Sequence, residues 1–308
     1  MTYGQLLVEL LVFTGLLFAA VAGLVTSWID SKVTARVQMR VGPPFLQPFY
    51  DIVKLFIKET SVPAGAPAWL FLSAPLLGFA AAGIASAILW RSMMAPYESF
   101  VGDWIVLLYL LTMPALATIL GSFASGNPLA SVGGSREMKL VMGYELPFVL
   151  ACLVPVIQAR GIRLGEILAA PAAAGTVSGA LALVVAIVCM QAKLALVPFD
   201  MAEAETELSG GAYIEYSGPP LAIFKLTRAM MLFTMPMFLV ALFCGGIAFD
   251  GGAAGILLGV LKYVGLIVVI VLVRNTAPRV RVDQALRFFW GPAAAVAMAA
   301  VALALAGG

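Results

Sequence analysis

Residues 198–218 read PFDMAEAETELSGGAYIEYSG and separate two long apolar segments, residues 177–197 and 219–243. This stretch, the acidic segment, contains five carboxylates: Asp200, Glu203, Glu205, Glu207 and Glu215. Hydrocarbon expels an ionised carboxylate at a cost of several kcal/mol, so such a cluster at a bilayer boundary must face water, protein or an ion path. A simple solvated loop would contain the same residue types, because loops are usually wet.

The composition around this segment is that of an integral membrane protein. Of the 308 residues, 62% are hydrophobic and 11% are charged, and the mean hydropathy is +1.04. Apolar runs of about 20 residues are long enough to cross a hydrocarbon core of about 30 Å as helices. Such runs lie at residues 4–29, 68–90, 103–124, 138–158, 177–197, 219–243, 254–274 and 285–306. The sequence therefore predicts an all-α, polytopic membrane protein with about eight transmembrane helices, forming a single integral membrane domain over residues 1–308.

The first apolar run is expected to be retained in the mature protein. Ala20-Val21-Ala22 has the small-x-small form of a signal cleavage site, but no Lys or Arg precedes it and Glu9 lies within the run. The run is also longer than a typical signal-peptide core. We therefore interpret it as a membrane helix.

Lys and Arg are concentrated in alternate connections. The first, third, fifth and seventh connections contain Lys32, Arg36, Arg40, Lys54, Lys58, Arg136, Lys139, Lys193, Arg274, Arg279, Arg281 and Arg287. The other connections contain only Arg91, Arg160 and Arg163. By the positive-inside rule the odd connections are cytoplasmic, and an even number of spans places both termini outside. Topology accounts for the basic residues, so the net charge of +2 does not indicate a nucleic-acid partner.

The chain lacks the side chains that hold redox cofactors. It has no histidine, and Cys152, Cys189 and Cys244 are scattered through the expected spans without paired spacing. Bis-histidine haem and an iron–sulfur cluster are therefore excluded for this chain. We expect no cofactor and no metal site in it, so its chemistry must rest on carboxylates, Lys, Arg and Tyr.

The first cytoplasmic connection is predicted to contain an amphipathic helix. Gly42-Pro43-Pro44 forces the chain out of the preceding helix. Over the following residues 49–59, apolar side chains recur at helical spacing and the charged ones lie more to the other side. Such a helix lies in the membrane interface or beneath a docked subunit.

A few charges fall inside the expected spans. Glu145 must be protonated, paired or in a hydrated cavity. Lys225 and Arg228 are three residues apart and share a helical face, which makes them candidate counterions for the acidic segment. Lys262 is expected to extend toward the outer interface.

Glu203 and Glu207 would share one face if the residues between them were helical. Like charges at this spacing repel, which tends to raise the pKa of at least one carboxyl. A raised pKa would suit a group that accepts and releases protons next to a redox partner.

Four separated blocks of the chain resemble a known family. The blocks are residues 36–59, with Arg-x-Gly-Pro and Asp-x-x-Lys patterns, residues 135–145, the acidic segment, and the short basic stretch at residues 274–284. They are similar to the eight-helix subunit shared by respiratory complex I (NADH dehydrogenase subunit 1-like) and the membrane-bound group 4 NiFe hydrogenases, including formate hydrogenlyase. Gly42-Pro43-Pro44 and the Gly-Gly-Ser-Arg-Glu sequence at residues 133–137 look more like the hydrogenase branch.

The resemblance implies a membrane-anchor and ion-coupling subunit of an energy-converting NiFe hydrogenase in a prokaryotic cytoplasmic membrane. Its partners would be a NiFe large subunit and iron–sulfur subunits on the cytoplasmic side, which carry the cofactors, and antiporter-like membrane subunits. The chain would be part of an oxidoreductase complex, have no catalytic residue, and link the redox arm to proton or sodium movement.

Two groups of residues are expected to carry this role. The ion-coupling group is Glu145, Asp200, Glu203, Glu205, Glu207, Glu215, Lys225 and Arg228. The subunit-docking group is Arg36, Arg40, Gln47, Asp51, Lys54, Lys58, Arg136, Glu137, Arg274, Arg279, Arg281 and Asp283.

Three alternatives remain open at this point. A quinone-chamber subunit of a complex I-type dehydrogenase would share most of the blocks. A stand-alone secondary transporter would show inverted repeats and paired broken helices, and the sequence shows neither. A passive anchor would have the same charged docking loops.

Overall fold

The computed structural model describes residues 15–203, 205–249 and 252–307, so residues 4–14 of the first expected span, with Glu9, lie outside the described residues. Within these ranges the chain is helical and contains no strand. The helices in chain order are α2 (Leu16–Val37), α3 (Gln47–Ile57), α4 (Ala68–Met94), η2 (Pro96–Glu98), α5 (Asp103–Ala124), α6 (Pro128–Ala159), α7 (Leu164–Ala169), η3 (Ala173–Gly175), α8 (Val177–Lys193), α9 (Glu205–Leu208), η4 (Gly211–Tyr213), α10 (Pro219–Cys244), α11 (Gly252–Thr276), α12 (Val282–Phe288), the π-helical η6 (Phe289–Ala293) and α13 (Ala294–Leu305).

The architecture expected from the apolar runs is confirmed, with one shorter helix. Seven helical stretches in the described part of the chain are long and apolar enough to cross a membrane: α2, α4, α5, α6, α10, α11 and the continuous α12–α13. The fifth expected span, residues 177–197, is the 17-residue α8 and is about 25 Å long at 1.5 Å per residue. It ends at Lys193 because the chain turns there, with Ala195 at a φ of 48° and the Leu196 N–H bonded to the Gln191 carbonyl at 3.2 Å.

The fourth expected span, residues 138–158, starts earlier than its apolar run. Pro128 occupies the first turn of α6, and the Asn127 side chain accepts a hydrogen bond from the Leu129 N–H at 2.8 Å. Residues 135–137 are therefore helical rather than part of a connection. Glu137, expected on the docking surface, is only 4% exposed because this turn of α6 faces the bundle.

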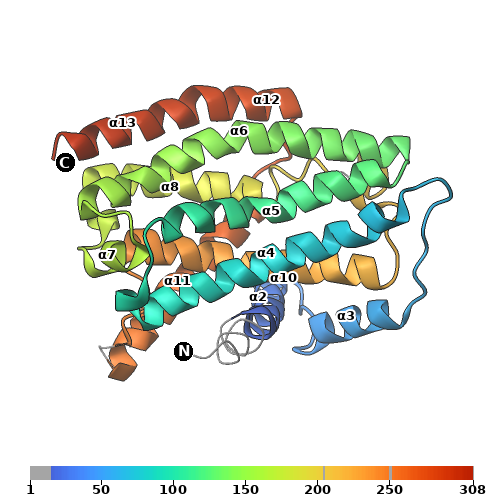
Figure 1. Cartoon of the computed structure of the whole chain (residues 1–308), viewed down its shortest axis with the longest axis horizontal. Helices are drawn as coiled ribbons and strands as arrows, with labels where there is room; N and C mark the ends of the chain where they lie inside the picture. The colour runs from blue at the N-terminus through green and yellow to red at the C-terminus, as the bar shows by residue number, and fades with distance from the viewer. Residues whose placement is uncertain (1–14, 204, 250–251, 308) are drawn as a thin grey trace.

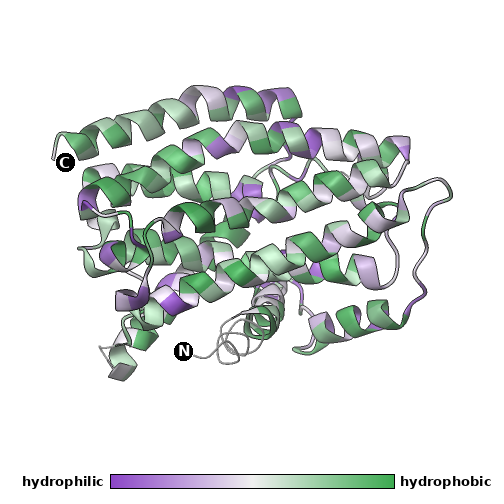
Figure 2. Cartoon of the chain, viewed as in Figure 1, coloured by the Kyte–Doolittle hydropathy of each residue, from purple (hydrophilic) through white to green (hydrophobic). Residues whose placement is uncertain are grey.

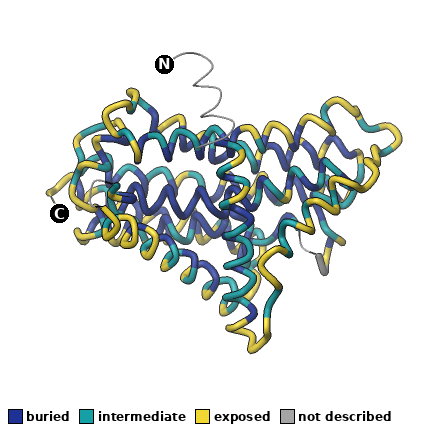
Figure 3. The backbone as a smooth tube through the Cα atoms, turned by 90° about the horizontal axis from the view of Figure 1, so that it is seen from below, coloured by how far each residue is buried: buried dark blue, intermediate teal, exposed yellow. Residues whose placement is uncertain are grey.

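The long helices pack around α10. Helix α10 contacts α2, α4 and α11, and 94% of its most apolar window is buried, against 22% for α11. Figure 1 views α2 nearly along its axis while α4, α5, α6 and α13 run across the picture, so α2 crosses them steeply. Apolar colour runs along the long helices in Figure 2, and the buried tube in Figure 3 lies in the interior of the bundle. Gly23 makes the crossing close, because a Cβ there would lie 2.6 Å from the Ala229 carbonyl of α10.

The odd connections meet at one end of the bundle. The Val280 N–H donates to the Pro198 carbonyl at 3.0 Å, and the Tyr216 hydroxyl donates to the Phe71 carbonyl at 3.0 Å. Asn127, before α6, donates its side-chain N–H to Glu215. These bonds link the third and seventh connections and the start of α4 to the acidic segment.

The amphipathic helix predicted for the first connection is present as α3. None of its residues is buried in the chain, although it contacts α2 and α10. In Figure 1 α3 lies at the edge of the bundle, beside the end of α10. It is therefore positioned to form one wall of a space at this end of the molecule.

Candidate functional site

The acidic segment is not one continuous helix. Its described residues form only two short helical turns, α9 at Glu205–Leu208 and η4 at Gly211–Tyr213. Glu203 precedes α9 in a turn and does not share a helical face with Glu207. The like-charged pair considered for these two residues does not form. Each carboxylate instead accepts a hydrogen bond from a different arginine.

Three arginines from three parts of the chain hold the acidic segment. They form the pairs Arg228–Glu203, Arg136–Glu207 and Arg279–Asp200, the last two with nitrogen–oxygen distances of 2.6 Å. The expected role of Arg228 as a counterion to the segment is confirmed. Because these arginines come from α10, α6 and the stretch before α12, the segment connects distant helices.

The carboxyls of Asp200 and Glu207 have pKa values shifted in opposite directions. Partial burial raises the pKa of Asp200 above its ordinary value, and the hydrogen bond and charge of Arg279 partly offset that rise. Glu207 is exposed, and the hydrogen bond from Arg136 lowers its pKa. For Glu207, the nearby guanidinium therefore outweighs repulsion by the other acids.

Glu145 lies deeper in the bundle and is paired. Its Oε2 lies 3.1 Å from Nζ of Lys193, and its Oε1 accepts a hydrogen bond from the Thr112 hydroxyl at 3.0 Å. Lys193 also donates to the Thr112 oxygen at 2.9 Å and lies 4.8 Å from the ring centroid of Phe148. Its side chain is 1% exposed, so its terminal nitrogen lies entirely inside the protein.

Lys193 is the residue that sequence reasoning missed. It counted only as one of the basic residues of the fifth connection, whereas it is the last residue of α8. The available signal was its flanking sequence, because Ala192, Leu194 and Leu196 make it an isolated charge in an apolar stretch. An ionisable residue in such a stretch is a functional candidate.

A small cavity connects the deep pair with the acidic segment. It has a volume of about 60 Å³, and its lining includes Glu137, Lys193, Glu203 and Arg228. Oε2 of Glu137 is buried and has no hydrogen-bond partner among the described residues. A space of this size holds a few water molecules, since one water needs roughly 10–15 Å³ measured in this way.

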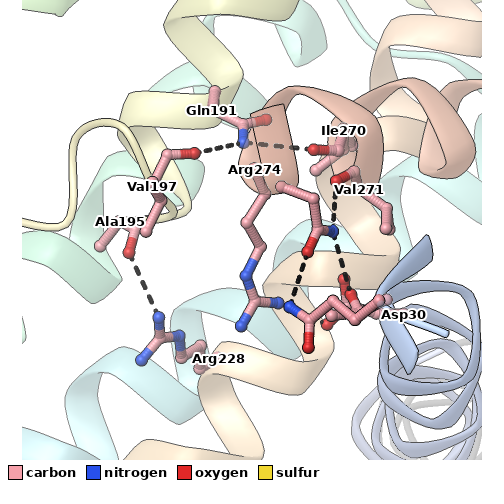
Figure 4. A network of polar contacts seen from close by, with 11 residues as sticks. Asp30, Gln191, Ala195, Val197, Arg228, Ile270, Val271 and Arg274 are labelled. Atoms are coloured by element: carbon pink, nitrogen blue, oxygen red, sulfur yellow. Dashed lines mark hydrogen bonds and ion pairs between the residues drawn. The ribbon is translucent and has the colours of Figure 1, made fainter. Parts of the chain in front are cut away.

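A larger cavity lies on the other side of Arg228. It has a volume of about 680 Å³ and is walled by α2, α3, α10 and residues 194–203. Figure 4 shows Arg228 donating to the Ala195 carbonyl and Arg274 pairing with Asp30, at 3.2 and 2.7 Å. In the same view Gln191 donates to the Val197 carbonyl at 2.8 Å. Ala195 and Arg228 line both cavities, so their hydrogen bond lies in the wall between them, whereas Asp30 and Arg274 line only the larger of the two.

The residues expected to dock a partner fall into three places. Exposed positions are Arg36, Arg40, Asp51, Lys54, Lys58, Arg279, Arg281 and Asp283. Gln47, Asp51 and Arg274 line the large cavity, with Gln47 donating to Asp51 at 2.9 Å. Arg136 and Arg279 pair with the acidic segment, and Glu137 is buried. The structure therefore leaves eight of these twelve residues exposed, although Asp51 and Arg279 also line the large cavity.

The remaining residues that the sequence analysis singled out lie outside the small cavity and the three arginine pairs. Lys225 is exposed at the mouth of the large cavity, and Glu215 accepts a hydrogen bond from Asn127. The side chain of Glu205 lies outside the described residues. Lys262 donates to the Cys244 carbonyl at 2.7 Å, so it binds the end of α10 instead of extending freely. Within the described residues, no group of three or more His, Cys, Asp or Glu side chains could hold a metal ion.

Comparison with known proteins extends over nearly the whole chain. The family described as NADH dehydrogenase matches residues 8–305. A subunit of the NADH-quinone oxidoreductase of Geobacillus kaustophilus is 33% identical over 294 residues, covering 89% of this chain and 86% of the relative. The corresponding subunit from Bacillus mycoides is 32% identical over 307 residues, covering 94% of this chain and 90% of the relative.

A solved structure has the same fold. A chain of the membrane-bound sulfane sulfur reductase, an archaeal respiratory membrane complex, matches with a TM-score of 0.86 and 25% identity, covering 98% of this chain and 99% of that one. The family match and the curated relatives agree with the four sequence blocks and with the helical bundle. The chain therefore belongs to the NADH dehydrogenase family of complex I-type membrane subunits.

Proposed function

We propose that this chain is the membrane-anchor and ion-coupling subunit of a multi-subunit, energy-converting NiFe hydrogenase in a prokaryotic cytoplasmic membrane. The observation that carries the proposal is the series of charged groups from the acidic segment into the bundle. It passes from Glu203 and Arg228, through the small cavity with Glu137, to Lys193 and Glu145. Charged groups inside a membrane bundle are costly and mark ion paths.

The arrangement gives a physical route for coupling. A redox subunit docked at the cytoplasmic end changes the local electrostatic potential as its centres gain and lose electrons. The acids of the segment respond because their protonation depends on nearby charge. A shift of the Arg228–Glu203 pair then acts on Glu137 and Lys193, which line the same small cavity.

The docking surface of this proposal is the exposed basic set at the same end. Arg36, Arg40, Lys54, Lys58 and Arg281 are exposed there. They would bind the acidic face of a NiFe large subunit or an iron–sulfur subunit, and those partners would hold the metal centres. Antiporter-like membrane subunits would lie beside the bundle within the bilayer.

Sequence features support the hydrogenase branch. Gly42-Pro43-Pro44 and residues 133–137 resemble that branch more than the quinone-reducing one. The similar solved chain belongs to a sulfane sulfur reductase complex. This likeness supports the idea that the fold also occurs in complexes whose electron acceptor is not a quinone. Metal analysis of the purified complex tests the branch: nickel in stoichiometric amount is expected, and a nickel-free complex would contradict it.

A quinone-chamber subunit is the second candidate, and the large cavity favours it. A volume of about 680 Å³ falls in the usual range for small-molecule sites, roughly 300–1,000 Å³. Curated relatives are named as subunits of NADH-quinone oxidoreductase. Reduction of a soluble quinone analogue by the complex, inhibited by quinone-site ligands, would support this candidate over the hydrogenase.

Replacing Glu145 tests the coupling role in either branch. Glu145→Gln should leave the complex assembled and its electron transfer to a soluble acceptor unchanged, while ion uptake into vesicles per electron falls. Glu98→Gln is the matched control, because Glu98 pairs with Arg91 in a connection at the opposite end. Unchanged ion uptake per electron in the Glu145 variant would overturn the coupling role.

A further inference from the structure

A third space, the α2–α11 pocket, lies between the ends of these two helices. It has a volume of about 280 Å³, and its lining includes Asp30, Ser31, Thr34, Gln38, Arg40 and Arg274. Asp30, Ser31 and Arg274 also line the large cavity, so the two spaces adjoin. The pocket belongs to neither the acidic segment nor the deep pair of Glu145 and Lys193.

Polar contacts between the two helices give this pocket its walls. Nη1 of Arg274 lies 2.7 Å from Oδ2 of Asp30, and Figure 4 shows this side chain reaching from α11 to α2. The Gln38 side-chain N–H donates to Asn275 at 3.0 Å and joins the same helix ends. The pocket is therefore formed by two helices bonded to each other and needs no loop to close over it.

The α2–α11 pocket contains donors for a phosphate group. Arg274 uses one nitrogen for Asp30, and a guanidinium carries five N–H donors. Arg40 forms no ion pair within the part of the chain that the structure describes. Ser31 and Thr34 add two hydroxyls. Basic pockets between membrane helices bind phospholipid headgroups through such donors.

Asp30 distinguishes this pocket from a simple anion site. It is 8% exposed, and its Oδ1 is buried without a hydrogen-bond partner among the described residues. A buried carboxylate oxygen is costly without a donor and repels a purely anionic headgroup. A ligand with a primary ammonium next to its phosphate would satisfy Asp30 and the arginines together.

The surroundings of the pocket suit a ligand that also has acyl chains. Of the spanning helices in the described ranges, α11 is the least buried in the bundle. Its exposed side chains include Val269 and Leu272, within two turns of Arg274, and Val37 is exposed at the end of α2. Headgroups of a bilayer lie where the apolar part of a spanning helix ends.

We propose that the α2–α11 pocket binds the headgroup of an aminophospholipid from the surrounding bilayer, with phosphatidylethanolamine as the simplest example. The lipid phosphate accepts hydrogen bonds from Arg40 and Arg274, and the primary ammonium donates to Oδ1 of Asp30. The acyl chains lie along the exposed apolar side chains of α2 and α11. The bound lipid links these helices beside the large cavity. The proposal does not depend on the function proposed above.

Lipid retention by the wild-type complex tests the proposal. The complex is delipidated in detergent and given one lipid at a time, all with the same acyl chains. Native mass spectrometry then counts the lipid on this chain after its release from the complex. Phosphatidylethanolamine should be retained at least about tenfold more tightly than phosphatidylcholine, whose quaternary ammonium has no N–H to donate. Diacylglycerol, which has no phosphate, should not be retained.

Three results with the wild-type complex would overturn the proposal. They are equal retention of phosphatidylethanolamine and phosphatidylcholine, tighter retention of phosphatidylglycerol, which has no ammonium, and retention of diacylglycerol. Free O-phosphoethanolamine carries the same charged groups without acyl chains, so a large excess of it should not displace the lipid. Displacement at an equal concentration would assign the pocket to a soluble ligand and would also overturn the proposal.

Asp30→Asn tests the residue that sets the preference. Asparagine keeps the shape of the side chain but has no charge, so retention of phosphatidylethanolamine should fall about tenfold, to the level of phosphatidylcholine. Glu59→Gln is the matched control, because it removes an exposed carboxylate of the first connection that does not line the pocket. A preference for phosphatidylethanolamine that survives in an assembled Asp30→Asn complex would overturn the proposal. If this variant does not assemble, the wild-type comparison decides.

Discussion

Single residues show how this bundle keeps charge inside an apolar fold. Arg228 pairs with Glu203 and donates a second hydrogen bond to the Ala195 carbonyl. Lys193 has a carboxylate, a hydroxyl and an aromatic ring around its ammonium. Both cations are thus compensated on more than one side. Lys193, whose side chain is 1% exposed, requires this because a buried charge is costly without partners, whereas the Arg228 side chain is 40% exposed.

Arg136 is expected to control the titration of Glu207. Because its hydrogen bond lowers the pKa of Glu207, that contact stabilises the fold above the ordinary carboxyl pKa and is lost as the pH falls through the lowered value. Arg136→Gln should raise the pKa of Glu207 toward the ordinary 4.5. Isotope-edited infrared titration of the carboxylate band measures the shift. Arg160→Gln, at the opposite end, serves as control, and an unchanged Glu207 titration in Arg136→Gln would contradict the assignment.

The sequence predicted the charged residues of the site better than their partners. Arg228 could be matched to the acidic segment because two charges three residues apart share a face. The pairs Arg136–Glu207 and Lys193–Glu145 join residues far apart in the chain, and no local pattern encodes such contacts. The predicted start of α6 was wrong for a different reason. The apolar run marks only the lipid-facing part of the helix, whereas the helix begins at Pro128, after the Asn127 cap.

At the scale of elements, close helix contacts hold the acidic segment against α6. Gly133 makes this possible, because a Cβ there would lie 2.7 Å from the Ala212 backbone nitrogen and 2.8 Å from the Ala202 carbonyl oxygen. Helix α6 and η4 therefore meet backbone to backbone. The segment is fixed by sterics as well as by its three arginines.

Gly133→Ala should push the acidic segment away from α6. The clash is with backbone atoms, which cannot rotate away, so we expect a loss of about 1–3 kcal/mol in unfolding free energy and a lower ion count per electron. Gly175→Ala is the control, since no atom lies within 4 Å of a Cβ at that position. Thermal unfolding of the detergent-solubilised complex measures the difference, and equal transition temperatures for the two variants would contradict this account of the contact.

At the scale of the whole molecule, the two ends differ in charge. The basic connections and the acidic segment meet at one end, joined by the bonds from Val280 to Pro198 and from Tyr216 to Phe71. The opposite end contains the small set Arg91, Arg160 and Arg163. This asymmetry predicts which end faces the cytoplasm.

Both termini are predicted to lie on the external side. A reporter that is active only in the cytoplasm should give no signal when fused after Gly308 and a strong signal when inserted in the stretch between α3 and α4. The second fusion controls for expression and insertion. A strong cytoplasmic signal from the C-terminal fusion would mean that the orientation is reversed or that a span is miscounted.

Charge reversal on the exposed basic docking surface should detach the redox subunits that are proposed to bind there. Arg40→Glu and Arg281→Glu alter exposed residues of two odd connections, whereas Arg279 would be a poorer choice because it pairs with Asp200. Copurification of these subunits with each variant is expected to fall at least about tenfold, since a reversed charge meets a like-charged partner. Arg160→Glu, at the other end, should copurify normally. Normal copurification with both Arg40→Glu and Arg281→Glu would rule out this docking surface.

The short length of α8 has an electrical consequence. Lys193 ends this helix, and residues 194–197 after it line the cavity of about 680 Å³. With this end on the cytoplasmic side, as predicted, water in that cavity would bring the voltage of that compartment close to the end of α8, so most of the membrane potential would fall across the ~25 Å of this helix. Moving one elementary charge through the whole potential is worth about 2.3 kcal/mol per 100 mV. In the proposed coupling role, a charge that moves from the end of α8 to the outside would cross nearly all of this potential along one helix, and turnover coupled to it would slow as the membrane becomes energised.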